Sequence, residues 1–315
     1  MGISTRGSDW ERVIEMSASI RNESEENVVN VWDERRQRLR RIWYRLKQNP
    51  LTIIGALMVF SVIFAAVFAP WIAPYPEDVT GQDFAKGATA PSADHLLGTD
   101  NQGRDILTRI LFGARISLGM GVIVLGIAGS IGITLGLISG FMGGRVSDVI
   151  MRVTDSFLAL PGLILALAIA AMLGPSLINL MIAISFAWWT QYARLVHGEV
   201  LSVKQEEFVE ASKALGASRR RIMFRELLPN IVSPLTVKLT LDMGFVIIAI
   251  AGLAFLGFGA EPPTPDWGVM IAQGRAHVTN FWWISVVPGI AISYTVMGFN
   301  LMGDGLRDVM DVEVE

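Results

Sequence analysis

Four residues between positions 98 and 105 have the types and spacing of an ion-binding loop. Gly98, Asp100, Gly103 and Asp105 alternate glycine with carboxylate, a mixture that loops use to hold calcium or to cradle phosphate. The spacing fits neither site, because the EF-hand ligand positions are not filled and no P-loop lysine is present. We therefore expect no catalytic residue, cofactor or metal site here.

Other residues with catalytic potential are scattered. His95, His197 and His277 fall at unrelated points, so no set of metal ligands follows. Ser139 lies in a glycine-rich apolar stretch and could serve an intramembrane hydrolase, but the expected topology provides no histidine at its depth to act as base. The sequence contains no G-x-x-x-x-G-K-[ST] pattern and no cysteine. We expect that the chain is not an enzyme and that a partner supplies its energy.

Two charged residues lie within an apolar stretch, where an unpaired charge costs several kcal/mol. Lys238 and Asp242 are four residues apart, so they can meet on one helical face and neutralise each other. The alternative is that Asp242 faces a translocation path.

The composition predicts an all-α polytopic membrane protein. Of 315 residues, 52% are hydrophobic and 17% are charged, and the mean hydropathy is +0.47. Long uncharged stretches predict six transmembrane helices, because Gly174-Pro175-Ser176 divides one of the stretches in two. The stretches are 50–72, 116–144, 156–193, 231–258 and 281–302.

A basic cluster at 34–47 precedes the first span and belongs on the cytoplasmic side, near anionic lipid. Nucleic-acid binding is the competing interpretation of basic and aromatic residues, and because a span adjoins the cluster we expect none. With six spans, both termini are cytoplasmic and the protein is expected in the plasma or inner cell membrane. The predicted divisions are a tail (1–49), the first helix with an outer loop (50–114), a five-helix core with a cytoplasmic loop at about 198–232 (115–305), and a short tail (306–315).

Glycine recurs at every fourth position in the second stretch, at Gly132, Gly136 and Gly140. Residues four apart share one face of a helix, so this stripe predicts the close approach of another helix.

The polar segment 202–234 predicts two short helices. Ser202 and Gln205 form a capping box for a helix over 203–215, which Gly216 ends in a left-handed conformation. Ser218 caps a second helix that ends near Pro229. Taken alone, this pattern also fits a solvated cytoplasmic loop.

The run Glu210-Ala211-Ser212, followed by Gly216 and Leu228-Pro229, resembles the EAA motif in the permease subunits of ABC importers. Ser212 and Glu226 depart from the common pattern. The runs 95–118, 252–275 and 299–308 are similar to the C-type permease of dipeptide, oligopeptide and nickel importers.

The resemblance implies the type I importer permease fold. It also implies a homologous second permease subunit, two cytoplasmic ATPase subunits and an external solute-binding protein as partners. The expected solute is a di- or oligopeptide, and the alternatives are nickel, opines or oligosaccharides. A secondary transporter or channel is the rival class, although it would not need the polar two-helix segment.

Residue roles follow from the same resemblance and from the expected topology. Contact with the ATPase is expected from Phe208, Glu210, Ala211, Ala214, Leu215 and Gly216. The outer loops 98–105 and 262–267 are expected to contact the binding protein or to close the outer gate, with Asp100 and Asp105 as candidate contacts.

Overall fold

The structure is a computed structural model that describes residues 49–81 and 87–310. The chain divides into two compact units, residues 1–50 and 51–315, and the fold below is that of the second unit. The predicted tail 1–33 and basic cluster 34–47 lie outside the described residues.

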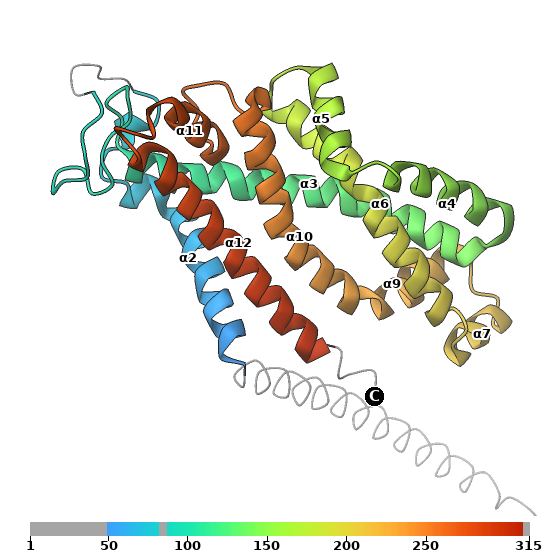
Figure 1. Cartoon of the computed structure of the whole chain (residues 1–315). Coiled ribbons are helices and arrows are strands. Elements are labelled where there is room, and N and C mark those ends of the chain that lie inside the picture. The colour runs from blue at the N-terminus through green and yellow to red at the C-terminus, as the bar shows by residue number, and fades with distance from the viewer. Residues whose placement is uncertain (1–48, 82–86, 311–315) are drawn as a thin grey trace, which may run out of the picture. The chain divides into compact units, whose positions relative to one another are not determined.

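In the described part of the chain all regular elements are helical, and a single isolated β-bridge joins Thr99 to Asp105. Figure 1 shows α2 and α12 running alongside each other, and α3 passing behind α10 toward α4. The long helices are α2 (Pro50–Ile72), α3 (Ile106–Met142), α4 (Gly144–Leu158), α5 (Gly162–Leu173), α6 (Leu177–Val203), α10 (Val232–Leu253) and α12 (Trp283–Met310). The short elements are η1 (Pro76–Val79), α7 (Glu207–Ala214), α8 (Arg219–Arg221), η2 (Ile222–Leu227), α9 (Leu228–Asn230), η3 (Ala254–Phe258), α11 (Trp267–Gly274) and η4 (Arg275–His277).

Several predicted spans begin and end at or near the bounds of the observed helices. The first coincides with α2, and the fifth corresponds to α10 together with the π-helical turn η3. The second begins earlier than predicted, at Ile106, because the Asp105 side chain accepts a hydrogen bond from the backbone N–H of Thr108 and so caps α3.

The predicted third span is wrong as a single straight helix. Residues 145–155, which lie between two of the predicted stretches, belong to α4, and the chain then bends by 86° into α5. Pro161 explains the break, because proline has no N–H to continue α4 and pushes the preceding residue away from helical geometry. With 12 residues, α5 is about 18 Å long, which is short for a hydrocarbon core of about 30 Å.

Four helices among the described residues are long and apolar enough to cross a membrane: α2, α3, α10 with η3, and α12. The bent pair α4–α5 makes a fifth candidate if it counts as one span. Helix α6 has 27 residues, enough to cross, but it carries Gln191, Arg194 and Glu199 in its second half. The total of six spans therefore stays a prediction.

The glycine stripe of α3 packs against α6, as predicted. A Cβ atom added to Gly136 would lie 2.6 Å from the Cβ of Val196, and one added to Gly140 would lie 2.7 Å from the Cβ of Val200. The helices α3 and α6 form the most extensive helix pair in the described structure. Glycine is needed here because only hydrogen fits between the two backbones.

Replacing Gly136 with valine should separate α3 from α6. We expect a loss of about 1–3 kcal/mol, the usual cost of overpacking a tight interface, measured as a lower unfolding temperature of the detergent-purified chain. Gly126→Val is the matched control, since nothing lies within 4 Å of a Cβ placed at Gly126. Equal unfolding temperatures for the two variants would contradict the packing role of the stripe.

Candidate functional site

The segment 202–234 begins differently from the prediction. Helix α6 continues through Ser202 to Val203, and α7 starts only at Glu207. The predicted capping box is therefore wrong, because Ser202 lies inside α6. The helical hydrogen bonds of α6 continue past Ser202, since the Lys204 N–H donates to Val200 O at 3.0 Å. A three-residue turn, Lys204 to Glu206, separates the two helices.

The end of α7 has the predicted left-handed glycine. Gly216 has φ of 77°, its N–H donates to Lys213 O, and the Ala217 N–H donates to Ser212 O, both at 3.0 Å. These two bonds define a Schellman motif, which requires a positive φ at the glycine position. Gly216 thus sets the direction in which the chain leaves α7.

The second predicted helix is also present. The Ser218 side chain accepts a hydrogen bond from Arg221 N–H at 3.3 Å, and the helical run ends at Asn230, next to Pro229. Its middle is the π-helical turn η2. Proline lacks an N–H and crowds the carbonyl four residues earlier, which accounts for a widened turn before Pro229.

Helix α7 is held on one face and open on the other. Val209 is fully buried in the main apolar cluster, together with Ile222 and Leu227 of η2. On the open face, Phe208 is 42% exposed and Leu215 is 88% exposed. The other predicted contact residues, Glu210, Ala211, Ala214 and Gly216, are exposed as well. Val209 was not among the predicted residues of this segment, because its burial depends on packing against η2, which leaves no local pattern in the sequence.

A polar hollow of about 340 Å³ lies between α7 and the second helical run. Glu226 lines it, and its Oε2 atom is buried without a hydrogen-bond partner among the described residues. The rest of the lining is Ser212, Leu215, Gly216, Ala217, Ser218 and Arg221.

The cytoplasmic loop predicted at 198–232 also contacts the end of α3. The Lys204 Nζ atom donates to Gly140 O at 2.9 Å, and the Lys213 Nζ atom lies 6.0 Å from the centroid of the Phe141 ring. Neither lysine was singled out from the sequence, because contacts between distant elements leave no local pattern.

The structure places Ser139 of α3 in contact with His197 of α6, a pair that the expected topology separates. Ser139 Oγ lies 2.9 Å from His197 Nδ1, so the expectation of no histidine near Ser139 is wrong. The Ser139 hydroxyl also donates to Gly136 O at 3.1 Å, and Ser139 is fully buried. The contact is therefore a hydrogen bond between α3 and α6, with the serine closed off from any substrate.

Lys238 and Asp242 form the predicted ion pair, with Lys238 Nζ 2.7 Å from Asp242 Oδ1. Two groups of α6 complete the pair: Tyr192 OH donates to Asp242 Oδ2 at 2.7 Å, and Lys238 Nζ donates to Gln191 Oε1 at 2.9 Å. Asp242 is 2% exposed. Its role in lining a path stays a prediction, and in this chain its observed contacts join α6 to α10.

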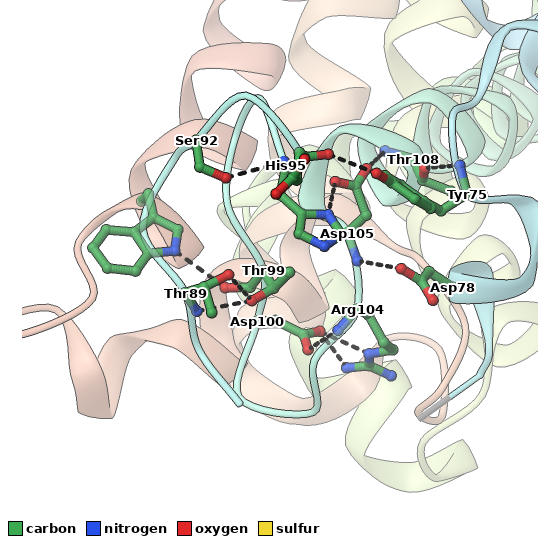
Figure 2. A network of polar contacts seen from close by, with 12 residues as sticks. Tyr75, Asp78, Thr89, Ser92, His95, Thr99, Asp100, Arg104, Asp105 and Thr108 are labelled. Carbon is green, nitrogen blue, oxygen red and sulfur yellow. Dashed lines mark hydrogen bonds and ion pairs between the residues drawn. The ribbon is translucent and has the colours of Figure 1, made fainter. Parts of the chain in front are cut away.

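The loop before α3 is organised by buried charges (Figure 2). Asp100 Oδ2 accepts from Arg104 Nε at 2.7 Å, and Asp100 Oδ1 accepts from the backbone N–H groups of Gln102 and Arg104. Asp105 caps α3, and its Oδ1 lies 3.0 Å from His95 Nδ1. We call this group, Asp78, His95, Asp100, Arg104, Asp105 and Arg109, the charged network.

Arg109 joins the charged network to the loop after η3. It is fully buried, and its Nη1 donates to Val79 O at 2.9 Å and to Pro263 O at 3.0 Å. Trp267 Nε1 adds a hydrogen bond to Ile110 O at 3.1 Å. Residues at the start of α3 thus connect the predicted loops 98–105 and 262–267. Arg109 was missed because its partners, the carbonyls of Val79 and Pro263 and the carboxylate of Asp100 at 3.7 Å, come from three separate segments.

Asp266 ends the same loop by capping α11 through Gly268 N–H at 2.7 Å. Burial raises the pKa of Asp266, while hydrogen bonds from the backbone N–H groups of Gly268, Val269 and Ala260 act in the opposite direction.

Both carboxylates predicted to face a binding protein point inward instead. Asp100 is 7% exposed and Asp105 is fully buried, because each is occupied by the hydrogen bonds of its own loop. That correction concerns the side chains, and a role of the loop surface stays a prediction. Across residues 49–81 and 87–310, no group of three His, Cys, Asp or Glu side chains is placed to hold a metal ion.

Asp100→Asn should destabilise the loop, because it leaves the buried Arg104 and Arg109 without their anion. Removing one partner of a buried ion pair typically costs about 3–5 kcal/mol. Thermal unfolding in detergent should show this loss, whereas Asp94→Asn, at an exposed position of the same loop, should unfold like the original chain. An unchanged unfolding temperature for Asp100→Asn would contradict a structural role of the network.

Two family models match the chain. Residues 132–314 match the model described as the binding-protein-dependent transport system inner membrane component. Residues 37–91 match the N-terminal TM domain of oligopeptide transport permease C. The first match covers α4 to α12 and contains the whole 202–234 segment.

Curated relatives extend the similarity over most of the chain. A probable D,D-dipeptide transport system permease protein of Escherichia coli (strain K12) is 43% identical over 270 residues, 86% of this chain and 90% of that protein. A di/tripeptide transport system permease protein of Pseudomonas aeruginosa (strain UCBPP-PA14) is 42% identical over 283 residues, 88% of this chain and 93% of that protein. A glutathione transport system permease protein of Escherichia coli O6:K15:H31 (strain 536 / UPEC) is 41% identical over 273 residues, 87% of this chain and 90% of that protein. The chain therefore belongs to the family of binding-protein-dependent transport system inner membrane components.

Proposed function

We propose that the chain is the permease subunit of an ATP-driven importer of di- or oligopeptides. The observation that carries the proposal is helix α7, which is anchored by Val209 and presents Phe208 and Leu215 to solvent. The relatives described above transport dipeptides, di/tripeptides and glutathione according to their names, which favours a peptide over nickel, an opine or an oligosaccharide.

The proposed complex contains a homologous second permease subunit, two ATPase subunits and a solute-binding protein. The 202–234 segment faces the cytoplasm and binds an ATPase, and the charged network lies on the opposite side of the membrane. With six spans both termini are cytoplasmic. The chain holds no P-loop sequence, so ATP hydrolysis falls to the ATPase subunits.

The exposed face of α7 has the chemistry of a docking helix. Phe208 and Leu215 provide large apolar surface, while Ala211 and Ala214 allow a partner to approach closely between them. Glu210 adds a charge at the edge of that surface. An exposed apolar face on a helix whose other face is buried marks an interaction surface.

Gly216→Val and Ala211→Trp should disconnect the chain from its ATPase. Valine at the φ of 77° costs about 1–2 kcal/mol in strain and redirects the chain after α7, and tryptophan blocks close approach. For a central docking contact we expect an affinity loss of about 2 kcal/mol, or roughly 30-fold, measured as reduced co-purification of the ATPase and reduced uptake of labelled dialanine.

Gly174→Val is the matched control for that experiment. Gly174 has φ of 85° and lies in the turn between α5 and α6, so the variant carries similar strain away from α7. If both test variants insert into the membrane, retain the ATPase fully and take up the peptide normally, α7 has no docking role and the 202–234 segment is only a solvated connection.

Asp242→Ala should destabilise the chain, since it leaves Lys238 charged and unpaired beside α6. The double variant Lys238→Met/Asp242→Asn should recover most of the stability, because it removes both charges while the introduced amide oxygen can still accept the hydrogen bond from the Tyr192 hydroxyl. Unfolding temperatures and uptake are measured together. Normal stability with lost uptake in the double variant would assign Asp242 to the path instead.

A further inference from the structure

Three consecutive residues at the end of α3 each contact a different residue beyond it. Ser139 Oγ meets His197 Nδ1, Gly140 O accepts from Lys204 Nζ, and the Phe141 ring lies under Lys213 Nζ. His197 belongs to α6, Lys204 follows α6, and Lys213 lies on α7. The end of α3 is therefore attached to both sides of the turn that leads into the docking helix.

The chemistry of these contacts suits a helix terminus. Gly140 O is among the last four carbonyls of α3, which have no partner within their own helix. A lysine ammonium is favoured there, because it donates to a free carbonyl at the negative end of the helix dipole. Lys213 adds a cation–π contact on the neighbouring ring.

The opposite end of the same helix lies in the charged network. Asp105 caps α3, and Arg109, one turn further on, binds the carbonyls of Val79 and Pro263. Between the two ends α3 has 37 residues and no proline, so it is one continuous rod of about 55 Å. The glycine stripe keeps the second half of the rod against α6.

We propose that α3 transmits the movement of the docking helix to the loops of the charged network, and that Lys204 and Lys213 are the positioning residues that attach it to α7. This inference rests on the proposed function, since it assumes that an ATPase moves α7. It adds that the movement reaches the far loops along a single helix, through two lysines that touch neither the ATP nor the solute.

The experiment uses the complete transporter in lipid vesicles, with its ATPase subunits and a fluorescent label at Ala93→Cys. The chain has no natural cysteine, so the label is unique within it when the chain is labelled before the complex is assembled, and Ala93 is an exposed position of the 87–105 loop. ATP binding should change the emission of the label in the otherwise unaltered chain. The readout needs ATP alone and does not depend on the identity of the solute.

Lys204→Met and Lys213→Met, combined in one chain, should reduce this ATP-dependent change about fivefold or more, the lower range of allosteric coupling between sites. The ATPase should stay bound and should still hydrolyse ATP. Lys204→Arg with Lys213→Arg keeps both cations and should restore the change. Arg145→Met, an exposed cation next to the end of α3, should behave like the unaltered chain.

Several outcomes would overturn the inference. An unaltered emission change in the double methionine variant would show that the lysines do not transmit movement. The absence of any ATP-dependent change in the original chain would show that the far loops do not respond. Loss of the ATPase from the methionine variant, with retention by the arginine variant, would assign the lysines to docking. Failure of the original chain to bind an ATPase would instead refute the proposed function.

Discussion

The contact between α3 and α6 is the packing constraint on which the other arrangements depend. In a membrane, helices gain little from hydrophobic burial against each other, so close backbone contact and hydrogen bonds have to hold them together. The stripe of Gly132, Gly136 and Gly140 provides that contact, and the Ser139–His197 hydrogen bond reinforces its end. Because α6 leads into α7 through a short turn, the same contact fixes where α7 emerges.

Two pairs of buried charges among the described residues are compensated within a few ångströms. Lys238 and Asp242 are paired with each other and with polar groups of α6. Asp100 and Arg104 are paired in the loop before α3. Buried ion pairs of this kind stabilise the folded state little compared with apolar residues in the same place. Removing one partner is costly, however, so these pairs favour the one alignment of the surrounding segments in which both partners meet.

Much of the fold could be predicted from sequence where the signal was local. A charge-free stretch gave the bounds of α2, glycine at every fourth position indicated the α3–α6 contact, and the glycine at 216 marked the end of α7. These features depend on residues within one or two turns of each other, which periodicity and capping rules describe well.

The errors arose where a local pattern allowed more than one outcome, or where distant residues decide the outcome. The 86° bend before α5 was missed because an uncharged stretch hides the break at Pro161, and Ser202 was taken for a cap although α6 continues through it. The inward orientation of Asp100 and Asp105 depends on Arg104, His95 and the backbone of their own loop, and so it follows from tertiary structure. The contacts of Lys204 and Lys213 with α3 likewise join segments more than sixty residues apart.

The exposure of Phe208 and Leu215 has a consequence for the life of the protein in a cell. Two large exposed apolar side chains on the otherwise polar helix α7 and its C-cap resemble the surface of an unfolded segment, which quality-control proteases and chaperones recognise. A partner that covers α7 removes that signal. If such a partner exists, copies of the chain without it would be degraded preferentially, and the abundance of this membrane protein would follow the supply of that partner.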